Sequence, residues 1–243
     1  MSEKRIAMWS GPRNISTALM RSFENRSDTT VLDEPFYAYY LFKTGLNHPG
    51  RDLVLDSQSS NLTDVINQCI GEIPEGNRIW YQKHMAQHNL ENSDLSWILN
   101  LKNCLLIRNP KDVIVSFKKN FLIDTVKQLG YPQQVQIYDY IKKKTGEGPV
   151  IIDAKDILEH PEKILQKLCS SLDIPFSFKM LSWPKGGRRT DGVWSPFWYM
   201  NVEKTTKFKK YKKSQEILEP SLLNLYDESM FFYKRLFDLR IKP

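Results

Sequence analysis

The segment most informative about chemistry is 10–17, which reads SGPRNIST. A β-branched and aromatic run precedes it and an amphipathic helical pattern follows it, so the segment is expected to join a strand to a helix. Unpaired backbone N–H groups and the helix dipole attract anions at such a position, and the hydroxyls of Ser16 and Thr17 add donors. Arg13 adds a forked positive charge. The segment therefore predicts a phosphate-binding loop.

This segment differs from a Walker A loop, which requires Gly-Lys before the hydroxyl residue. Asn14 and Ile15 precede Ser16 here instead. The difference counts against a nucleotide triphosphatase. On this segment alone one alternative stays open, namely a helix start that is simply capped by a serine or threonine.

A second basic residue, Arg108, follows the apolar run 104–107 and precedes Asn109-Pro110, a pair typical of a helix start. An arginine at the carboxyl end of a strand, beside a helix N-terminus, can bind another phosphate. Ser116 lies within the expected helix. One such turn is as often a capping feature as a binding site, but two strand-to-helix anion sites in one sheet are a more specific combination.

A candidate general base, Glu34, comes shortly after the apolar run 29–32. Because the carboxyl ends of parallel strands share one edge of a sheet, Glu34 is expected near Arg13. Two alternatives stay open, since Glu34 can instead cap a helix or form an ion pair with Arg13 or Arg21. Asp33 is the less favoured neighbour.

A rival base, His84, lies just beyond the apolar run 78–82. The ordinary pKa of histidine, near ~6.5, suits proton transfer near neutrality. A histidine beside a strand end is nevertheless more often structural than catalytic. The preceding Lys83 is a candidate for binding the leaving phosphate, and His88 has less support as a base.

The elements that must position these residues are five short apolar runs separated by helical patterns, at 5–9, 29–32, 78–82, 104–107 and 150–153. This alternation predicts an α/β fold, a three-layer sandwich around a parallel sheet of about five strands. A helix is expected from Pro161 to about Asp173 and a final one over about 220–239. The length of 243 residues fits one domain over 1–243.

Residues 183–213 are rich in glycine, tryptophan and basic residues and show weak periodicity. They predict a long loop or lid with one short helix. The aromatic side chains are candidates either to close over a substrate and exclude water or to pack on the sheet. The run KTTKFKKYKK within the segment receives no assigned role.

Composition limits the class of protein. The chain carries 35 Lys and Arg against 28 Asp and Glu, a formal charge of +7, which favours anionic ligands without requiring nucleic acid. No apolar stretch reaches the ~18 residues of a membrane helix and no secretory leader is evident, so a cytoplasmic protein without a membrane span is expected. Three widely spaced cysteines, at positions 69, 104 and 169, predict buried thiols rather than disulfides or a metal site.

Together, SGPRNIST and IRNPKDVIVS resemble the 5′-phosphosulfate loop and the 3′-phosphate element of sulfotransferases that use 3′-phosphoadenosine 5′-phosphosulfate (PAPS). LDIPFSFKMLSWP and DGVWSPFWY resemble segments of a broad, mostly bacterial sulfotransferase-like group, so the resemblance covers about 5–208. It implies a P-loop-like fold and transfer of a sulfuryl group from PAPS to a hydroxyl or amine of an acceptor, without a metal. The acceptor is either a small molecule or a side chain.

The resemblance also implies roles for individual residues. Arg108 and Ser116 hold the 3′-phosphate, and the 5′ end lies on Arg13, Asn14, Ile15, Ser16 and Thr17. Arg13 also has a catalytic role, because it faces the sulfuryl end and stabilises charge there during transfer. Glu34 matches the base of the tyrosylprotein enzymes, whereas Lys83-His84 resembles the Lys-x-His of cytosolic members with the spacer missing.

Two departures from the family pattern stand out. Cytosolic members carry lysine where this chain has Arg13, which keeps the charge but changes its geometry. The family's RKGxxG element has only a loose counterpart at 185–189. Two other functions stay open, a P-loop kinase of small molecules that needs Mg²⁺ and ATP, and a non-catalytic protein that binds an adenosine bisphosphate.

Overall fold

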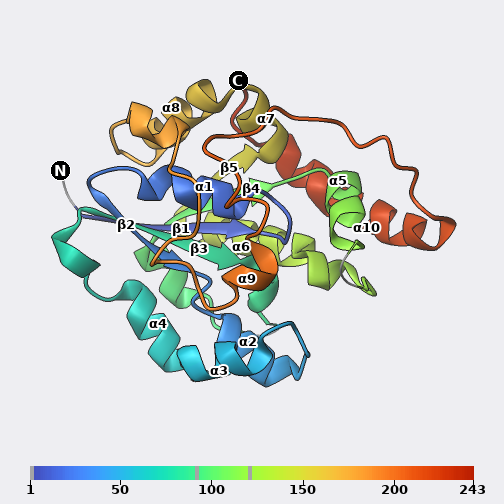
Figure 1. Ribbon diagram of the computed structural model, residues 1–243, viewed down its shortest axis with the longest axis horizontal. Coiled ribbons are helices and arrows are strands. Elements are labelled where there is room, and N and C mark those ends of the chain that lie inside the picture. Colours follow the sequence, from blue (N-terminus) through green and yellow to red (C-terminus); the bar gives the residue numbers. More distant parts are fainter. Residues whose placement is uncertain (1–2, 91–92, 120–121) are drawn as a thin grey trace.

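The structure is a computed structural model that describes residues 3–90, 93–119 and 122–243. Five parallel strands form one sheet in the order β2-β3-β1-β4-β5 (Figure 1). Their bounds are β1 Lys4–Ser10, β2 Thr29–Asp33, β3 Ile79–Met85, β4 Lys102–Ile107 and β5 Val150–Asp153. Each apolar run singled out in the sequence overlaps one strand, so the predicted parallel sheet is confirmed.

Helices form most of the connections between the strands. They are α1 Ser16–Glu24, α2 Tyr37–Thr44, α3 Arg51–Ser57, α4 Leu62–Ile70, α5 Pro110–Phe117, α6 Tyr131–Thr145, α7 Ala154–Glu159, α8 Pro161–Ser171, α9 Ser195–Trp198 and α10 Leu223–Phe237. Short 3₁₀ turns occur at Pro74–Gly76, Ala86–His88, Ser96–Asn100, Val126–Leu129, Phe178–Leu181 and Pro220–Leu222.

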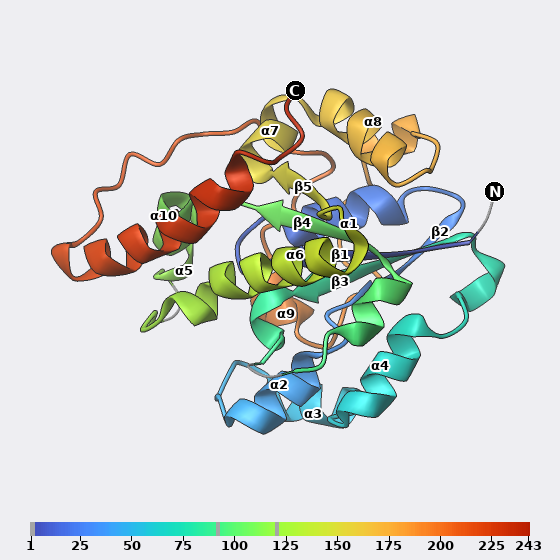
Figure 2. The ribbon, with the colours of Figure 1, turned by 180° about the vertical axis from the view of Figure 1, so that it is seen from behind.

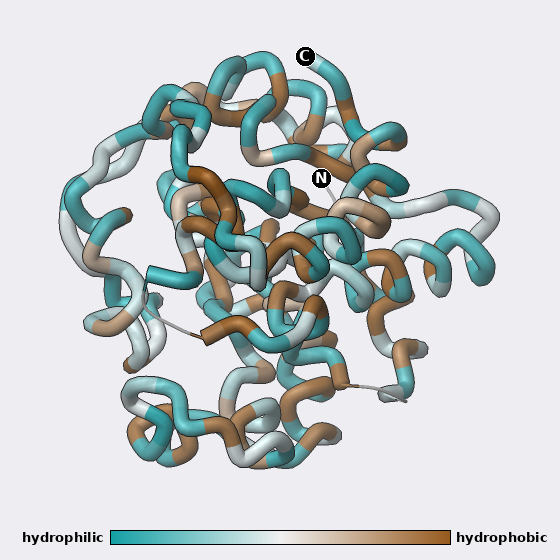
Figure 3. Tube along the Cα trace, turned by 90° about the vertical axis from the view of Figure 1, so that its right-hand side faces the viewer, coloured by the Kyte–Doolittle hydropathy of each residue, from teal (hydrophilic) through white to brown (hydrophobic). Residues whose placement is uncertain are grey.

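Both faces of the sheet are covered, because successive side chains of β1 enter two different apolar cores. Ile6 and Met8 pack with side chains of α1, α2, α7 and α8. Ala7 and Trp9 pack with side chains of α5, α6 and α10. Figure 2 views the molecule from behind and shows α6 across the near side of the sheet, with α10 beside it. Figure 3 shows apolar and polar stretches alternating along the chain, as expected where helices turn one face to a core. The three-layer sandwich is therefore confirmed.

The final helix expected over about 220–239 is present as α10, and its apolar side chains differ in burial. Phe231 is 71% exposed, whereas Leu236 is fully buried. Ser229, Tyr233 and Leu236 form the buried side of α10. Phe231 follows Ser229 by two positions, about 200° around the helix, and so faces the opposite side.

The three cysteines lie inside the fold. Cys69, Cys104 and Cys169 are free and buried, as predicted. No helix in the described part of the chain is both long and apolar enough to cross a membrane.

Residues 183–213 follow a long path over the α1 side of the sheet and contain the single helix α9 (Figure 1). Trp183, Trp194 and Tyr199 are almost fully buried in the core on this side. A single antiparallel bridge joins Ser182 to Lys207. Several aromatic rings of the segment thus pack against the sheet and anchor it there.

Candidate anion-binding and acid-base site

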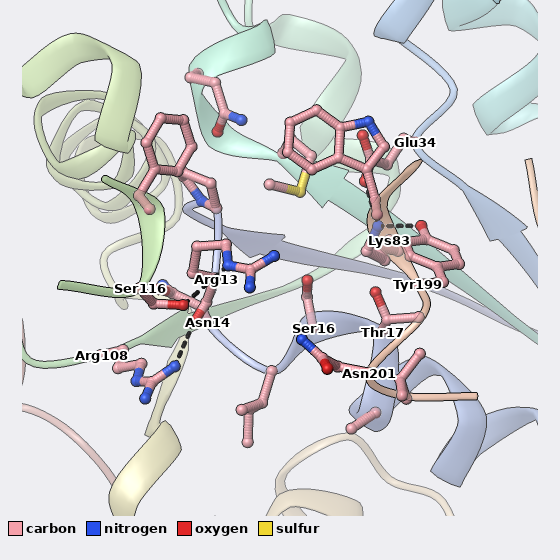
Figure 4. A pocket seen from close by; sticks show the side chains of 18 of the residues that line it. Arg13, Asn14, Ser16, Thr17, Glu34, Lys83, Arg108, Ser116, Tyr199 and Asn201 are labelled. Carbon is pink, nitrogen blue, oxygen red and sulfur yellow. Dashed lines mark hydrogen bonds and ion pairs between the residues drawn. The ribbon is translucent and has the colours of Figure 1, made fainter. Parts of the chain in front are cut away.

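A cavity of about 710 Å³ opens where four strands end. Its walls come from the loop between β1 and α1, from residues that follow β2 and β4, from the end of β3, and from residues 198–212 (Figure 4). Ligands in open parallel sheets bind at this carboxyl edge, because helix N-termini and loops converge there. Of the candidates named from the sequence, the ones that line the cavity are Arg13, Asn14, Ile15, Ser16, Thr17, Glu34, Lys83, His88, Arg108 and Ser116.

The loop before α1 has an unusual backbone. Arg13 and Ile15 have φ values of 62° and 58°, in the left-handed region that residues other than glycine rarely adopt. Alternation of this conformation curves the chain and turns successive N–H groups toward one point, which creates an anion-binding concavity. Among the residues that the structure describes, none accepts a hydrogen bond from a backbone N–H between Arg13 and Thr17. The loop therefore presents unpaired donors to the cavity.

The simpler alternative for this loop, a side-chain cap on α1, is not observed. The N-cap residue is Ile15, which has no side chain able to accept a hydrogen bond, and no side-chain cap is present. Ser16 and Thr17 lie inside the first turn of the helix and line the cavity. Their hydroxyls are thus available to a ligand.

Two arginines meet at the next part of the cavity. Nε of Arg13 donates a hydrogen bond to Oγ of Ser116 at 3.0 Å, and Nη1 of Arg108 donates to the carbonyl oxygen of Arg13 at 2.5 Å. Burial and the nearby charge of Arg108 lower the pKa of Arg13. The only carboxylate within salt-bridge reach of either guanidinium, among the described residues, belongs to Asp112, 3.9 Å from Arg108. Like charges held together in this way favour an anionic ligand between them.

The local sequence explains the position of Arg108. Asn109 is the N-cap of α5 and its side chain accepts a hydrogen bond from the backbone N–H of Lys111 at 3.0 Å, while Pro110 is the first helical residue. The predicted helix start is confirmed. Arg108 therefore leaves the end of β4 directly beside the N-terminus of α5, and Ser116 lies on the same helix.

Glu34 lies at the opposite part of the cavity, just after β2. Its carboxylate pairs with the Lys83 ammonium, a contact that the sequence did not suggest. The sequence alternatives for Glu34 do not hold in the described chain, since Arg21 pairs with Glu24 and Asp191, and Arg13 contacts Ser116. Burial raises the pKa of Glu34, and the charge of Lys83 opposes that rise. The group is a buried carboxylate held beside a cation at the cavity wall.

Asp33 precedes Glu34 but is not part of the cavity wall. Its carboxylate accepts hydrogen bonds from the Lys83 ammonium at 3.0 Å and from the Tyr199 hydroxyl at 2.7 and 2.8 Å. Asp33 is thus committed to contacts within the protein. This agrees with its lower rank as a base.

His84 is not brought to the cavity. Its ring stacks on Trp9 with 4.4 Å between centroids, and Nε2 lies 3.1 Å from the side-chain oxygen of Gln82. Burial lowers the pKa of His84 to about 3. Since successive residues of a strand point to opposite faces, Lys83 reaches the cavity while His84 enters the other core. Packing of this kind argues against a role for His84 as base.

His88 lines the cavity together with Tyr37, Tyr40 and His48, which had no assigned role from the sequence. The His88 ring stacks on Tyr37 and Tyr40, with centroid distances of 5.0 and 4.6 Å. The Tyr37 hydroxyl lies 2.9 Å from Nδ1 of His48, and burial lowers the pKa of both histidines. These rings form an aromatic wall near Glu34. The aromatic run 36–40 was the only signal for it in the sequence.

The unassigned basic run contributes the last wall, which we call the basic strap, residues 205–212. Its cavity-lining side chains include Lys207, Lys209, Lys210 and Lys212. The hydroxyl of Tyr211 donates a hydrogen bond to the Asp112 carboxylate at 3.0 Å, which ties the strap to α5. Four lysines therefore join the two arginines around the same cavity.

The loose counterpart of RKGxxG lies elsewhere. Arg188 contacts Glu24 at 3.5 Å, and Arg189 contacts Glu75 at 2.8 Å. Neither arginine lines the cavity. Within residues 3–90, 93–119 and 122–243, no group of three or more His, Cys, Asp or Glu side chains is arranged to hold a metal ion.

With this geometry in place, the class of protein can be stated. The chain matches the sulfotransferase domain family over residues 4–237 and belongs to that family. Solved structures with the same fold include the sulfotransferase domain of the Synechococcus olefin synthase, with a TM-score of 0.63 and 14% identity over 100% of this chain and 98% of that one. A mouse sulfotransferase complexed with PAP has a TM-score of 0.56 and 16% identity, covering 98% and 87%.

More similar in sequence are two plant proteins. Branched-chain-amino-acid aminotransferase-like protein 1 of Arabidopsis thaliana is 37% identical over 236 residues, which cover 95% of this chain and 41% of that protein. The corresponding protein 2 is 35% identical over 221 residues, or 90% and 39%. The chain thus spans about two fifths of the length of these curated relatives.

Proposed function

We propose that this chain transfers a sulfuryl group from PAPS to a hydroxyl or amine of an acceptor. The observation that carries the proposal is the close approach of two arginines beside a loop with unpaired N–H groups: Arg13 bonds Ser116, and Arg108 bonds the carbonyl oxygen of Arg13. Two half-buried guanidiniums so close together, on two helix N-termini, form a site for a ligand with more than one anionic group. PAPS carries such groups at both its 5′ and 3′ positions.

The residues present fit PAPS. The unpaired backbone donors of 13–17, with the hydroxyls of Ser16 and Thr17, would hold the 5′-phosphosulfate. Arg108 and Ser116 would hold the 3′-phosphate, and the basic strap would supply the positive charge that RKGxxG supplies elsewhere in the family. The mouse sulfotransferase that shares this fold was solved with PAP, which supports the same class of ligand here. When bound, PAPS supplies the activated sulfuryl group.

Glu34 is proposed as the general base. It lines the same cavity as the anion site, and a carboxylate there can take the acceptor proton as the new bond to sulfur forms. Its partner Lys83 keeps a positive charge close to the reacting centre, where negative charge develops on the leaving phosphate. His84 is separated from this cavity by its packing on Trp9, so Glu34 is favoured over it.

The acceptor would enter beside the aromatic wall. Tyr37, Tyr40, His48 and His88 line the part of the cavity next to Glu34, together with Trp198. Closely packed rings exclude water, which would otherwise compete with the acceptor for the sulfuryl group. The acceptor is a small molecule or a side chain that reaches into this space.

A transfer assay tests the proposal. The purified chain is incubated with PAPS and pools of hydroxyl and amine compounds, and sulfated products are sought by mass spectrometry while PAP is quantified. We expect PAP to form in proportion to one sulfated product, and Glu34→Gln to slow the formation of both by roughly 10²- to 10⁴-fold. Tight PAP binding without transfer to any acceptor would instead favour the non-catalytic protein, and phosphorylated products from ATP would favour the kinase.

A further inference from the structure

Lys83 lies at the centre of a buried polar cluster at the cavity wall (Figure 4). The side chain is 1% exposed, and its ammonium contacts Asp33 at 3.0 Å, Tyr199 at 2.8 Å and the Glu34 carboxylate. Tyr199 comes from residues 183–213, far along the chain from the two acids. The cluster therefore joins the ends of β2 and β3 to that segment.

The Lys83 ammonium and the Tyr199 hydroxyl use all of their hydrogen-bonding positions. An ammonium has three N–H donors, and Lys83 has three partners. A phenolic hydroxyl has one donor and two acceptor positions. Tyr199 donates to Asp33 and accepts from Lys83 and from the indole N–H of Trp194 at 3.1 Å. Such complete pairing fixes the ammonium in one position.

The two carboxylates in the cluster differ in their exposure to a ligand. Asp33 also accepts a hydrogen bond from the backbone N–H of Gly192 at 3.2 Å and does not line the cavity. Glu34 does line it. Of the two carboxylates, only Glu34 can therefore exchange a proton directly with a bound acceptor, while Asp33 stays hydrogen-bonded within the protein.

This difference has a consequence for the reaction. During transfer the acceptor oxygen bonds to sulfur, the bond from sulfur to the bridging oxygen breaks with its electron pair staying on the phosphate, and the acceptor proton goes to Glu34. Neutral Glu34 then no longer balances the charge of Lys83. A buried ammonium without a counter-ion would tend to lose its own proton or move.

We propose that Tyr199 and Asp33 are positioning residues, which hold the Lys83 ammonium charged and in place while Glu34 gains the acceptor proton. This inference rests on the proposed function. The N–H of Lys83 that Glu34 releases becomes available to the oxygen of the leaving phosphate, so proton uptake and stabilisation of the leaving group are coupled through one side chain. The segment 183–213 would thereby contribute to the reaction through Tyr199 as well as to the cavity wall.

The test compares Tyr199→Phe with Tyr233→Phe. Tyr233 is a matched control, since its buried hydroxyl also donates to a carboxylate, that of Asp153 at 3.0 Å, away from Lys83. For Tyr199→Phe we expect kcat to fall roughly 10- to 100-fold with PAP affinity changed less than about twofold. The acid limb of the rate profile should also move to higher pH, because Glu34 loses the support of a fixed Lys83.

A change of kcat without movement of the acid limb, or equal changes in both variants, would reduce Tyr199 to a structural residue and overturn the proposal. A second readout needs no turnover. In protein labelled with ¹⁵N-lysine, the Lys83 ammonium should give a slowly exchanging NMR signal, which Tyr199→Phe weakens and Tyr233→Phe leaves intact. Absence of a protected signal in the unsubstituted protein would also overturn it.

The two readouts separate the failure of this inference from that of the proposed function. If the unsubstituted protein transfers no sulfuryl group, the proposed function fails, and the NMR signal alone decides whether Tyr199 and Asp33 fix Lys83. If it does transfer the group and Tyr199→Phe behaves as Tyr233→Phe does, only the inference about positioning fails.

Discussion

Arg13 and Ser116, 103 positions apart in sequence, share a hydrogen bond of 3.0 Å from Nε to Oγ. The contact links the loop after β1 with α5, and thereby the two elements expected to bind opposite ends of PAPS. From the sequence, Arg13 was expected to face the sulfuryl end, because it lies in the 5′ loop. The guanidinium also contacts, through Nε, the residue expected to bind the 3′-phosphate (Figure 4).

This position changes the expected effect of Arg13→Ala. A charged hydrogen bond typically contributes about 1.5 to 3 kcal/mol, so the variant should weaken PAP roughly ten- to a hundredfold, and PAPS by a similar factor. Arg5→Ala is a suitable control, since Arg5 bonds Gly71 and Glu3 rather than the cavity. Calorimetry with both ligands measures the losses. A loss of affinity for PAPS alone would indicate that Arg13 binds the sulfuryl end.

Glu34→Gln should lower turnover by roughly 10² to 10⁴ while PAP affinity stays nearly constant, because the amide keeps the volume and loses the basicity. Asp124→Asn removes another acid from the cavity wall and provides the control. Since burial raises the pKa of Glu34, the rate of the unsubstituted protein should fall as pH drops through a value above that of an ordinary glutamate. Single-turnover rates decide between the bases: a normal rate for Glu34→Gln with a collapsed rate for His84→Ala would favour the histidine.

The buried histidines predict acid sensitivity of the fold. His84 has a pKa lowered to about 3, so the folded state binds fewer protons there than the unfolded state, whose histidines titrate near ~6.5. The stability that neutral, buried His84 contributes is therefore present above about pH 6.5 and is lost as pH falls below that value. Between pH 7 and pH 5 this should remove about 2 kcal/mol from the free energy of unfolding for His84 alone.

Urea unfolding at the two pH values measures this loss. His84→Phe, which retains a ring beside Trp9, should show a pH dependence smaller by about the same amount. An identical pH dependence in the variant and the unsubstituted protein would mean that His84 titrates normally in the folded state.

The left-handed backbone at Ile15 predicts that glycine is more stable than alanine at this position, which is the reverse of their order inside a helix. In a left-handed conformation alanine is strained and glycine is not, so Ile15→Gly should be more stable than Ile15→Ala by about 1 kcal/mol. Ala18 lies inside α1 and is the control, because Ala18→Gly should lose about 1 kcal/mol. Chemical unfolding of the three variants tests the comparison, and a more stable Ile15→Ala would contradict the strained geometry.

Much of the fold could be predicted because its signals are local. The runs that became β1 to β5 are short, apolar and rich in β-branched residues, and helical patterns separate them. The Asn109-Pro110 pair specified the start of α5 for the same reason. The sequence also predicted that the loops after β1 and β4 lie together in the candidate site, because parallel strands bring their carboxyl ends to one edge of the sheet.

The rest of the site depends on contacts between distant residues. The Tyr199 hydroxyl bonds Asp33 across 166 positions, and no local pattern indicates that pairing. The basic run 204–213 received no role from the sequence, because only its path over the cavity shows that its lysines line the site. His84 became a candidate because a strand end indicates an edge of the sheet, whereas alternation decides which core each side chain enters.

Discrimination for a 3′-phosphate tests the central claim most directly. Calorimetry compares PAP with AMP, which lacks that group, and with ATP in the presence of Mg²⁺, for the unsubstituted protein and for Arg108→Ala. We expect PAP to bind at least roughly tenfold more tightly than AMP or ATP, and Arg108→Ala to remove most of the difference, since a charged hydrogen bond contributes about 1.5 to 3 kcal/mol. AMP or ATP binding as tightly as PAP would contradict the assignment of this cavity to PAPS.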